Sequence, residues 1–279
     1  MTKDEAKQLA DQALQELHSD LKAGRSETLL RYLDAMSRFH SYSWNNSLLI
    51  LLQMPTASHV AGYRKWLELG RHVRQGEKGI GIMAPMVYRK KSDSDEQSTG
   101  DKDQRRILGF RIVHVFDVSQ TEGADLPELS SLQADVGHLL PSLEELVRNC
   151  GIRLVTETLA PGVKGVSRKG EIAISDSLSG AERLAVLAHE VAHEWMHDET
   201  QRADLTRTVR ETEAEAVAYV VCRSLGIDCS SRSADYIQLY NGTEDTLTAS
   251  LERIQKTAAR MIGLLSATST IPSDESLVA

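Results

Sequence analysis

An alanine-rich, apolar run around two histidines is the most constraining feature of this 279-residue chain. Residues 183–196 hold neither Gly nor Pro, include Leu-Ala-His-Glu-Val-Ala-His over 187–193, and are therefore predicted to be helical. Residues four apart on a helix are separated by roughly 6 Å along the axis and about 40° around it, so His189 and His193 can converge on one metal ion. The intervening Glu190 can face water bound to that ion. The motif predicts a zinc-dependent hydrolase, most naturally a peptidase, with Glu190 as general base.

A third protein ligand is needed, because a catalytic zinc keeps its fourth position for water. His197 lies one turn beyond His193, but three histidines on successive turns of a straight helix cannot surround one ion. We expect His197 at the surface or behind a ligand. The third ligand is expected from the following helix, where Glu211 and Glu215 share a face and Glu213 points elsewhere.

The spacing E-x-x-A-E over 211–215 resembles the gluzincin signature, in which a ligand Glu precedes a residue that orients a metal-bound His. The resemblance implies that Glu211 is the third ligand and that Glu215 fixes the tautomer of a zinc His. The reverse assignment stays open, and a solvated acidic helix face is the competing interpretation. Zn²⁺ is the expected ion, with Mn²⁺ or Co²⁺ as alternatives. The donor to the oxyanion has four candidates: Tyr219, Tyr236, Tyr240 and His197.

The composition indicates a globular protein, with 41% hydrophobic and 26% charged residues and a length sufficient for two domains. Three cysteines are too few for a disulfide framework. The charged first residues do not resemble a signal peptide, and no apolar run approaches the length of a membrane span. We therefore expect a cytoplasmic protein with no membrane partner.

The net charge of −8 argues against nucleic-acid binding, but the charges are distributed unevenly. Residues 61–91 hold eight basic and two acidic side chains, whereas the second half of the chain is strongly acidic. Such asymmetry suggests a basic surface joined to an acidic catalytic half.

The predicted elements divide the chain into an α+β protein of two domains. Helices are expected at 3–22, 26–39, 45–53 and 61–69, then strands at 79–88 and 107–118 around a polar linker at 91–101. A helix near 134–149 and strands at 152–157, 165–168 and 171–175 precede the histidine helix, and helices near 208–226, 232–241 and 244–265 follow it. The last of these strands is expected to be the edge that pairs with an extended substrate. We predict a mixed helix and antiparallel-sheet domain over 1–125, a second domain over 126–268 and a disordered tail over 269–279.

Several motifs of the first half occur in a distinctive order. They are Tyr-Ser-Trp-Asn-Asn-Ser-Leu-Leu-Ile over 42–50, Gln-Met-Pro-Thr-Ala over 53–57, Val-Ala-Gly-Tyr-Arg-Lys-Trp over 60–66, Gly-Arg-His-Val-Arg-Gln-Gly-Glu-Lys-Gly-Ile over 70–80 and Phe-Asp-Val-Ser-Gln-Thr over 116–121. Together they resemble the N-terminal domain of ArdC-type antirestriction proteins of conjugative plasmids. The second half resembles the ArdC metallopeptidase domain, with Cys-Arg-Ser-Leu-Gly over 222–226, and also the ImmA/IrrE-like group.

The resemblance implies that the first half binds single-stranded DNA and that the second is a gluzincin-like zincin domain. The candidate DNA contacts are basic residues for phosphates and aromatic residues for base stacking: Arg64, Lys65, Arg71, Arg74, Lys78, Tyr42 and Trp44, with Tyr63 and Trp66 as further candidate platforms. Core packing of Trp44 and Trp66 is an equally good interpretation.

The expected function is that of a single-stranded-DNA-binding, metallopeptidase-type antirestriction protein, which protects incoming mobile DNA from host restriction and acts on an unknown protein substrate. One alternative is a DNA-recruited protease that acts on DNA-bound or regulatory proteins. The other is a non-enzymatic DNA-binding protein with a structural metal site.

Overall fold

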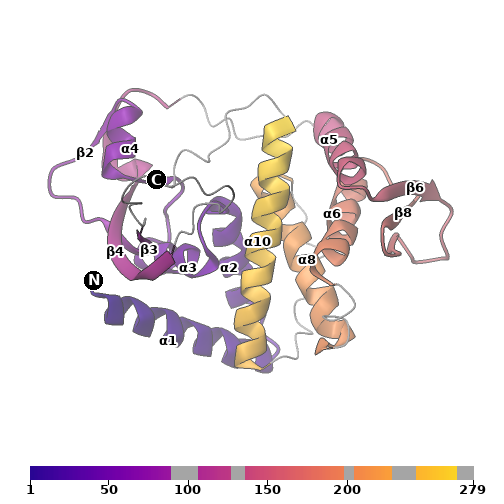
Figure 1. The fold of residues 1–279 in the computed structure, drawn as a ribbon, viewed down its shortest axis with the longest axis horizontal. Coiled ribbons are helices and arrows are strands. Elements are labelled where there is room, and N and C mark those ends of the chain that lie inside the picture. The colour runs from indigo at the N-terminus through magenta and orange to yellow at the C-terminus, as the bar shows by residue number, and fades with distance from the viewer. Residues whose placement is uncertain (89–105, 127–135, 198–203, 228–242, 269–279) are drawn as a thin grey trace, which may run out of the picture.

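Two structural halves and a long C-terminal helix make up the part of the chain that the computed structural model describes, residues 1–88, 106–126, 136–197, 204–227 and 243–268 (Figure 1). The first half begins with three helices: α1 (Lys3–Lys22), α2 (Glu27–Arg38) and α3 (Trp44–Gln53). Thr2 and Glu5 form a capping box at the start of α1, and the Ser43 hydroxyl accepts from the Asn46 amide at the start of α3. These caps satisfy amide groups that the first turn leaves unpaired.

A small antiparallel sheet lies against these helices. The strands β3 (Ile80–Tyr88) and β4 (Arg106–Asp117) pair along their lengths, and β1 (Val60–Gly62) pairs with the other edge of β4. A single helix over 61–69 was expected, but helix α4 (Tyr63–Glu68) begins only after β1. Beyond β4 the short helix η1 (Val118–Gln120) leads to β5 (Thr121–Gly123), which pairs with β2 (Arg71–Val73). The expected linker over 91–101 lies outside the described residues.

The second half consists of helices with a small three-stranded sheet on the outer side. Its elements are α5 (Val136–Asn149), β6 (Arg153–Glu157), β7 (Gly165–Ser167), β8 (Glu171–Ser175), α6 (Gly180–Met196) and α8 (Arg207–Ser224). The strand order is β6–β8–β7, with β6 parallel and β7 antiparallel to β8. The expectation that the last strand before the histidine helix forms the edge was wrong. β8 is the central strand, because β7 returns to pair with its other side.

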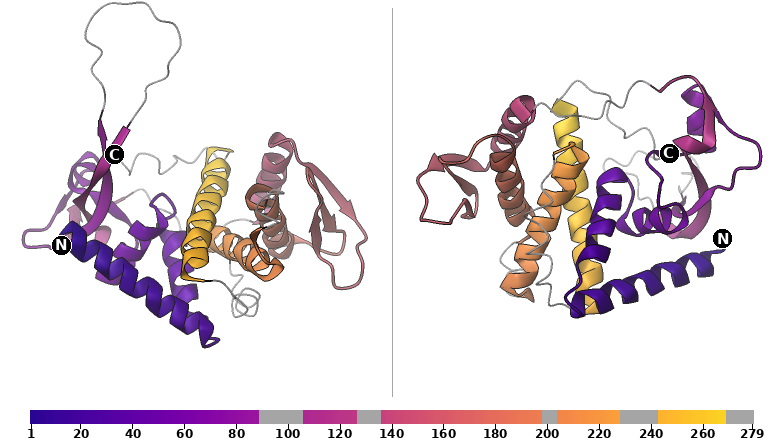
Figure 2. Two further views of the ribbon diagram at one scale, coloured as in Figure 1. Left: turned by 60° about the horizontal axis from the view of Figure 1, so that its bottom comes forward. Right: turned by 180° about the vertical axis from the view of Figure 1, so that it is seen from behind.

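The long helix α10 (Glu244–Thr268) stands between the two halves in all the ribbon views (Figures 1 and 2). It packs against α5, α6 and α8 on one side and against α1 and α3 on the other. The Gln255 side-chain amide donates to the backbone carbonyls of His40 and Tyr42, which lie between α2 and α3. The expected helix near 232–241 and the tail over 269–279 lie outside the described residues.

One apolar stripe fixes the orientation of α6. Leu184, Leu187, Ala188, Val191 and Ala192 are fully buried, and their spacing covers one face of a helix. Truncating such a leucine to alanine costs about 2–5 kcal/mol. Burial of this stripe leaves the histidines of the motif on the adjoining face, toward α8. Among the described residues, no helix combines the length and the apolar character that a membrane span requires.

Candidate functional site

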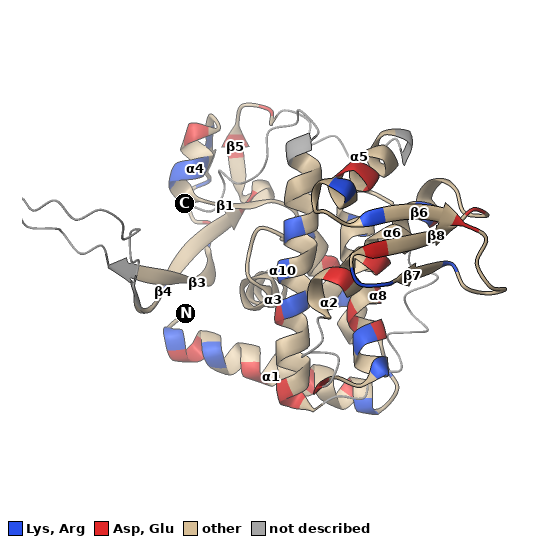
Figure 3. Cartoon of the chain, turned by 45° about the vertical axis from the view of Figure 1, so that its right-hand side comes forward, with Lys and Arg blue, Asp and Glu red and all other residues tan. Residues whose placement is uncertain are grey.

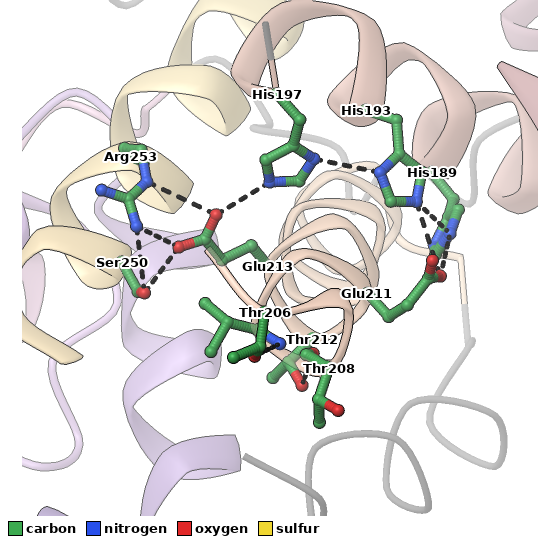
Figure 4. Close-up of polar contacts among 11 residues, drawn as sticks. His189, His193, His197, Thr206, Thr208, Glu211, Thr212, Glu213, Ser250 and Arg253 are labelled. Atoms are coloured by element: carbon green, nitrogen blue, oxygen red, sulfur yellow. Dashed lines mark hydrogen bonds and ion pairs between the residues drawn. The ribbon is translucent and has the colours of Figure 1, made fainter. Parts of the chain in front are cut away.

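Three side chains from two helices converge in the second half of the chain (Figure 4). His189 Nε2 and His193 Nε2 on α6 lie 3.1 Å apart. Glu211 Oε2 on α8 is 3.6 Å from the first nitrogen and 3.5 Å from the second. With metal–ligand bonds of about 2.0–2.2 Å, neighbouring ligand atoms of a tetrahedral zinc site are roughly 3.3–3.5 Å apart. The three separations therefore fit one face of such a site, and among the described residues this trio is the group that could hold a metal ion.

The other ring nitrogen of each histidine has its own partner. His189 Nδ1 lies 3.2 Å from Glu215 Oε2, and His193 Nδ1 lies 3.0 Å from His197 Nδ1. An Nδ1–H that donates outward leaves the Nε2 lone pair directed into the cluster. The structure thus brings Glu211 to both histidines and places Glu215 behind His189.

The charges of the cluster are strongly coupled. Burial alone would lower the pKa of His189, but hydrogen bonds with Glu211 and Glu215 outweigh it and raise this pKa to about 9. Burial lowers the pKa of His193. Hydrogen bonds from both histidines hold the pKa of Glu211 well below its usual range. The raised pKa favours a second proton on the His189 ring at neutral pH, and binding of a metal ion there would release it.

Glu190 occupies the buried position next to these ligands. Burial raises the pKa of Glu190 to about 7, the charge of His189 lowers it, and the charge of Glu211 raises it further. Its carboxylate packs against β7, where a methyl group on Gly165 would lie 2.7 Å from Glu190 Oε1 and 2.8 Å from Val186 Cγ1. Only glycine allows β7 to approach this closely, and a carboxyl group with a pKa near neutrality is suited to proton transfer.

Glu194 holds the same strand to α6, a role that the sequence analysis missed. Its carboxylate accepts from the Ser167 hydroxyl at 2.5 Å and from the Gly170 amide at 2.8 Å. The residue directly follows the second histidine of the motif, and its charge alone does not reveal which strand it binds.

His197 and Glu213 form a buried network with α10. His197 Nε2 lies 2.9 Å from Glu213 Oε2, and the Glu213 carboxylate also accepts from Arg253 and from Ser250. His197 is 2% exposed, so its expected placement at the surface was wrong, and its contact with His193 puts it behind a ligand. Glu213 points away from Glu211, as predicted, but into the core rather than to solvent.

The two candidate oxyanion donors within the described residues both contact other side chains. The Tyr219 hydroxyl donates to Asp34 Oδ1 at 3.2 Å and so faces α2. His197 is turned toward Glu213. Tyr236 and Tyr240 lie outside the described residues.

Two of the expected DNA contacts have structural roles. Tyr42 is buried, and its hydroxyl donates to the Val60 carbonyl, so it offers no exposed ring for stacking. The Arg71 guanidinium donates to the Thr121 hydroxyl and to the carbonyls of Thr121 and Ala124, which fastens β2 to β5. In both residues a distant segment satisfies the polar group. The buried Tyr42 was wrongly expected to stack on bases, whereas a phosphate contact of Arg71 stays a prediction.

The remaining basic candidates differ in their availability. Arg64 and Lys78 are exposed, and neither side chain has an ion pair or hydrogen bond with any described residue. Arg74 contacts Glu77 and the Ser119 carbonyl, and Lys65 pairs with Glu68 at 3.3 Å. Helix α4, which carries two of these residues, lies at the end of the molecule away from α6 and α8 (Figure 3).

The aromatic candidates also separate into two groups. Trp66 is 2% exposed, and its indole nitrogen donates to the Phe116 carbonyl, so it belongs to the core. Tyr63 is 51% exposed. Trp44 is partly buried and, with the exposed Phe110, lines a cavity of about 350 Å³ between the first half and α10.

Comparisons with known proteins agree with this arrangement. The family model for the N-terminal domain of anti-restriction factor ArdC matches residues 3–116. The model for the IrrE N-terminal-like domain, of the M78 peptidase type, matches residues 148–222, which include the cluster. The chain has the domains and the fold of an ArdC-type antirestriction protein.

Two solved structures share the fold over nearly the whole length of this chain. The metal-free crystal structure of antirestriction protein ArdC from the R388 plasmid superimposes with a TM-score of 0.53 at 19% identity and covers 95% of this chain and 99% of its own. The Mn(II)-bound structure of that protein gives a TM-score of 0.51 at 19% identity, with 94% and 98% covered.

A curated relative, the uncharacterized protein pXO2-81 of Bacillus anthracis, is 24% identical over 94% of this chain. The chain spans about half the length, 51%, of that relative.

Proposed function

We propose that this ArdC-type chain is a metal-dependent, peptidase-type antirestriction protein that binds single-stranded DNA through its first half. The observation that carries the proposal is the convergence of His189, His193 and Glu211 beside the buried Glu190. A structural zinc site is closed by four protein ligands, whereas a catalytic site has three and an open position. The described residues supply three, which favours catalysis over the structural-metal alternative.

The donor set suits a divalent ion, because it combines two imidazoles whose Nε2 atoms converge with one ionised carboxylate. Zn²⁺ is the proposed ion. Mn²⁺ and Co²⁺ are alternatives, and the R388 ArdC protein binds Mn(II) in one of its crystal structures. When bound, the ion would supply Lewis acidity to a substrate carbonyl.

The chain's own residues would bind the substrate and move the proton. β7 is the edge strand beside Glu190, and no other strand among the described residues pairs with its free side. An extended peptide added along that side would pass the cluster. Glu190 would accept a proton from the attacking water and return it to the leaving nitrogen, as its pKa near neutrality allows.

Single-strand binding would use the exposed cations Arg64 and Lys78, with Arg74 and Lys65 nearby in sequence, and the rings of Trp44 and Tyr63. Protection of incoming mobile DNA would combine this binding with cleavage of a DNA-associated protein. The proposed substrate is a peptide bond in an extended segment of such a protein.

A Glu190→Gln variant tests the enzymatic part. We expect it to retain metal and single-strand affinity and to lose peptidase activity and antirestriction in a conjugation assay. Full antirestriction with Glu190→Gln, together with no proteolysis by wild type, would refute the enzymatic proposal and support a DNA-binding protector. Lost proteolysis of DNA-bound proteins with unchanged antirestriction would instead support the DNA-recruited protease.

A further inference from the structure

We infer that a buried chain of contacts, from Arg253 through Glu213 and His197, sets the tautomer in which His193 presents Nε2 to the metal. This chain of contacts lies behind the cluster, where α6, α8 and α10 meet (Figure 4). The inference rests on the proposed metal centre and adds three positioning residues to it. Each of them would act through His193 rather than on the ion itself.

The first step is the geometry of the two imidazoles. His193 Nδ1 lies 3.0 Å from His197 Nδ1, and His197 Nε2 lies 2.9 Å from Glu213 Oε2. Glu213 is 0% exposed and His197 2%, so water does not compete for these atoms. A contact between two Nδ1 atoms needs one donor and one acceptor, so the proton of one ring decides that of the other.

The Glu213 carboxylate determines which nitrogen donates and which accepts in each contact. An ionised Glu213 can only accept, so His197 Nε2 carries a proton and donates to it. The other nitrogen of a neutral His197 ring, Nδ1, is then an acceptor, and His193 Nδ1–H donates to it. His193 Nε2 is left with a lone pair, and it lies 3.5 Å from Glu211 Oε2 inside the cluster.

Arg253 and Ser250 on α10 keep the carboxylate in this state. Arg253 donates to both oxygens of the buried Glu213 carboxylate, and Ser250 donates to one of them, an arrangement that suits an ionised carboxylate. The Arg253 guanidinium pairs with this carboxylate and neutralises its buried charge. Arg253 Nη2 and Ser250 both donate to Oε1, whereas Oε2 accepts from His197 at 2.9 Å and, over a longer 3.4 Å, from Arg253 Nε.

The end of α6 allows the ring of His197 to turn inward. Helix α6 ends at Met196, and His197 is the capping residue, with φ −116° and ψ 69° outside the helical range. Its backbone amide still donates to the His193 carbonyl at 3.1 Å. The residue therefore stays close to His193 while its side chain reaches α8.

The test is Glu213→Gln, which keeps the shape and replaces one oxygen by a donor. Arg253 Nη2 and Ser250 both require an acceptor at Oε1, whereas Oε2 receives only the longer 3.4 Å contact from Arg253 Nε besides His197. The new NH₂ group therefore takes the Oε2 position, faces His197 and reverses each proton along this chain of contacts. We expect the affinity for Zn²⁺, measured by competition with a chelator, to fall about 10–100-fold. The matched control is Glu244→Gln, which alters another Glu–His contact, 3.3 Å to His18 Nδ1, and should leave the affinity unchanged.

A second measurement keeps the inference testable if Glu213→Gln does not fold. In ¹⁵N-histidine NMR of the metal-free wild-type chain, His197 should carry its proton on Nε2, and His193 should carry one on Nδ1. An affinity of Glu213→Gln within twofold of wild type, or a proton on His197 Nδ1 in wild type, would overturn the inference. Absence of Zn²⁺ binding by wild type would refute the metal centre itself, and the NMR result would still decide the tautomers.

Discussion

Metal binding to this chain should depend steeply on pH, because the ion must displace a proton from His189. The carboxylates of Glu211 and Glu215 outweigh burial and raise the pKa of His189 to about 9 in the ion-free site. A pH of 7 lies two units below that pKa, and each unit adds about 1.4 kcal/mol to the free energy of removing the proton. Removing it therefore costs roughly 3 kcal/mol, which is about a 100-fold reduction of the apparent affinity at pH 7 relative to pH above 9.

The assay is a chelator competition with Zn²⁺ from pH 6 to pH 9, together with calorimetry in two buffers of different ionisation enthalpy. We expect the affinity to rise about tenfold per pH unit through this range, and about one proton to be released per ion at pH 7. Glu215→Gln replaces one of the two carboxylates that raise this pKa by a neutral amide, so the affinity should level off at lower pH. An affinity that stays flat across the range, with no proton released, would refute the claim that the metal ion displaces a proton from His189.

Three further predictions concern other parts of the molecule. Gly165→Ala should displace the Glu190 carboxylate and lower kcat/KM about 10–100-fold while the metal content stays at one ion per chain; unchanged kcat/KM would show that β7 does not constrain the base. Replacing Arg64 and Lys78 by Glu should weaken single-strand binding and reduce its salt dependence, measured by fluorescence anisotropy at several salt concentrations, and an unchanged slope would exclude both as phosphate contacts. Burial raises the pKa of Tyr32 to about 12, so this phenol contributes roughly 3 kcal/mol of stability that is present below pH 10 and lost as the pH rises to 12. The urea midpoint should then fall more steeply above pH 10 in wild type than in Tyr32→Phe, and parallel curves would contradict the burial argument.

The helices and the long strands could be predicted from the sequence because their signals are local. The apolar spacing of α6 and the caps of α1 and α3 lie within the elements that they determine. Of the described three-residue strands, β7 was predicted at 165–168, but β1, β2 and β5 were missed, because a strand of that length shows no periodicity. Their partners are distant: β2 pairs with β5 about 50 residues away, and that pairing also explains why Arg71 is occupied.

The expected cluster followed from spacing on two helices, but its surroundings did not. Glu211 and Glu215 share a face of α8 because they are four residues apart, and that is a local property. Glu213 lies on another face, and only the packing of α10 determines that this face is buried and meets Arg253. Likewise, the aromatic character of Tyr42 is visible in the sequence, whereas the contact of its hydroxyl with Val60 depends on the tertiary fold.

The most direct test of the central claim is elemental analysis of the purified chain after incubation with Zn²⁺ or Mn²⁺ and removal of the excess. Wild type, Glu211→Ala and Glu215→Ala should be compared. The account predicts one ion per chain in wild type, its loss in Glu211→Ala, and its retention with lower affinity in Glu215→Ala. Wild type that takes up neither ion, or a Glu211→Ala variant that retains a full complement, would contradict the account.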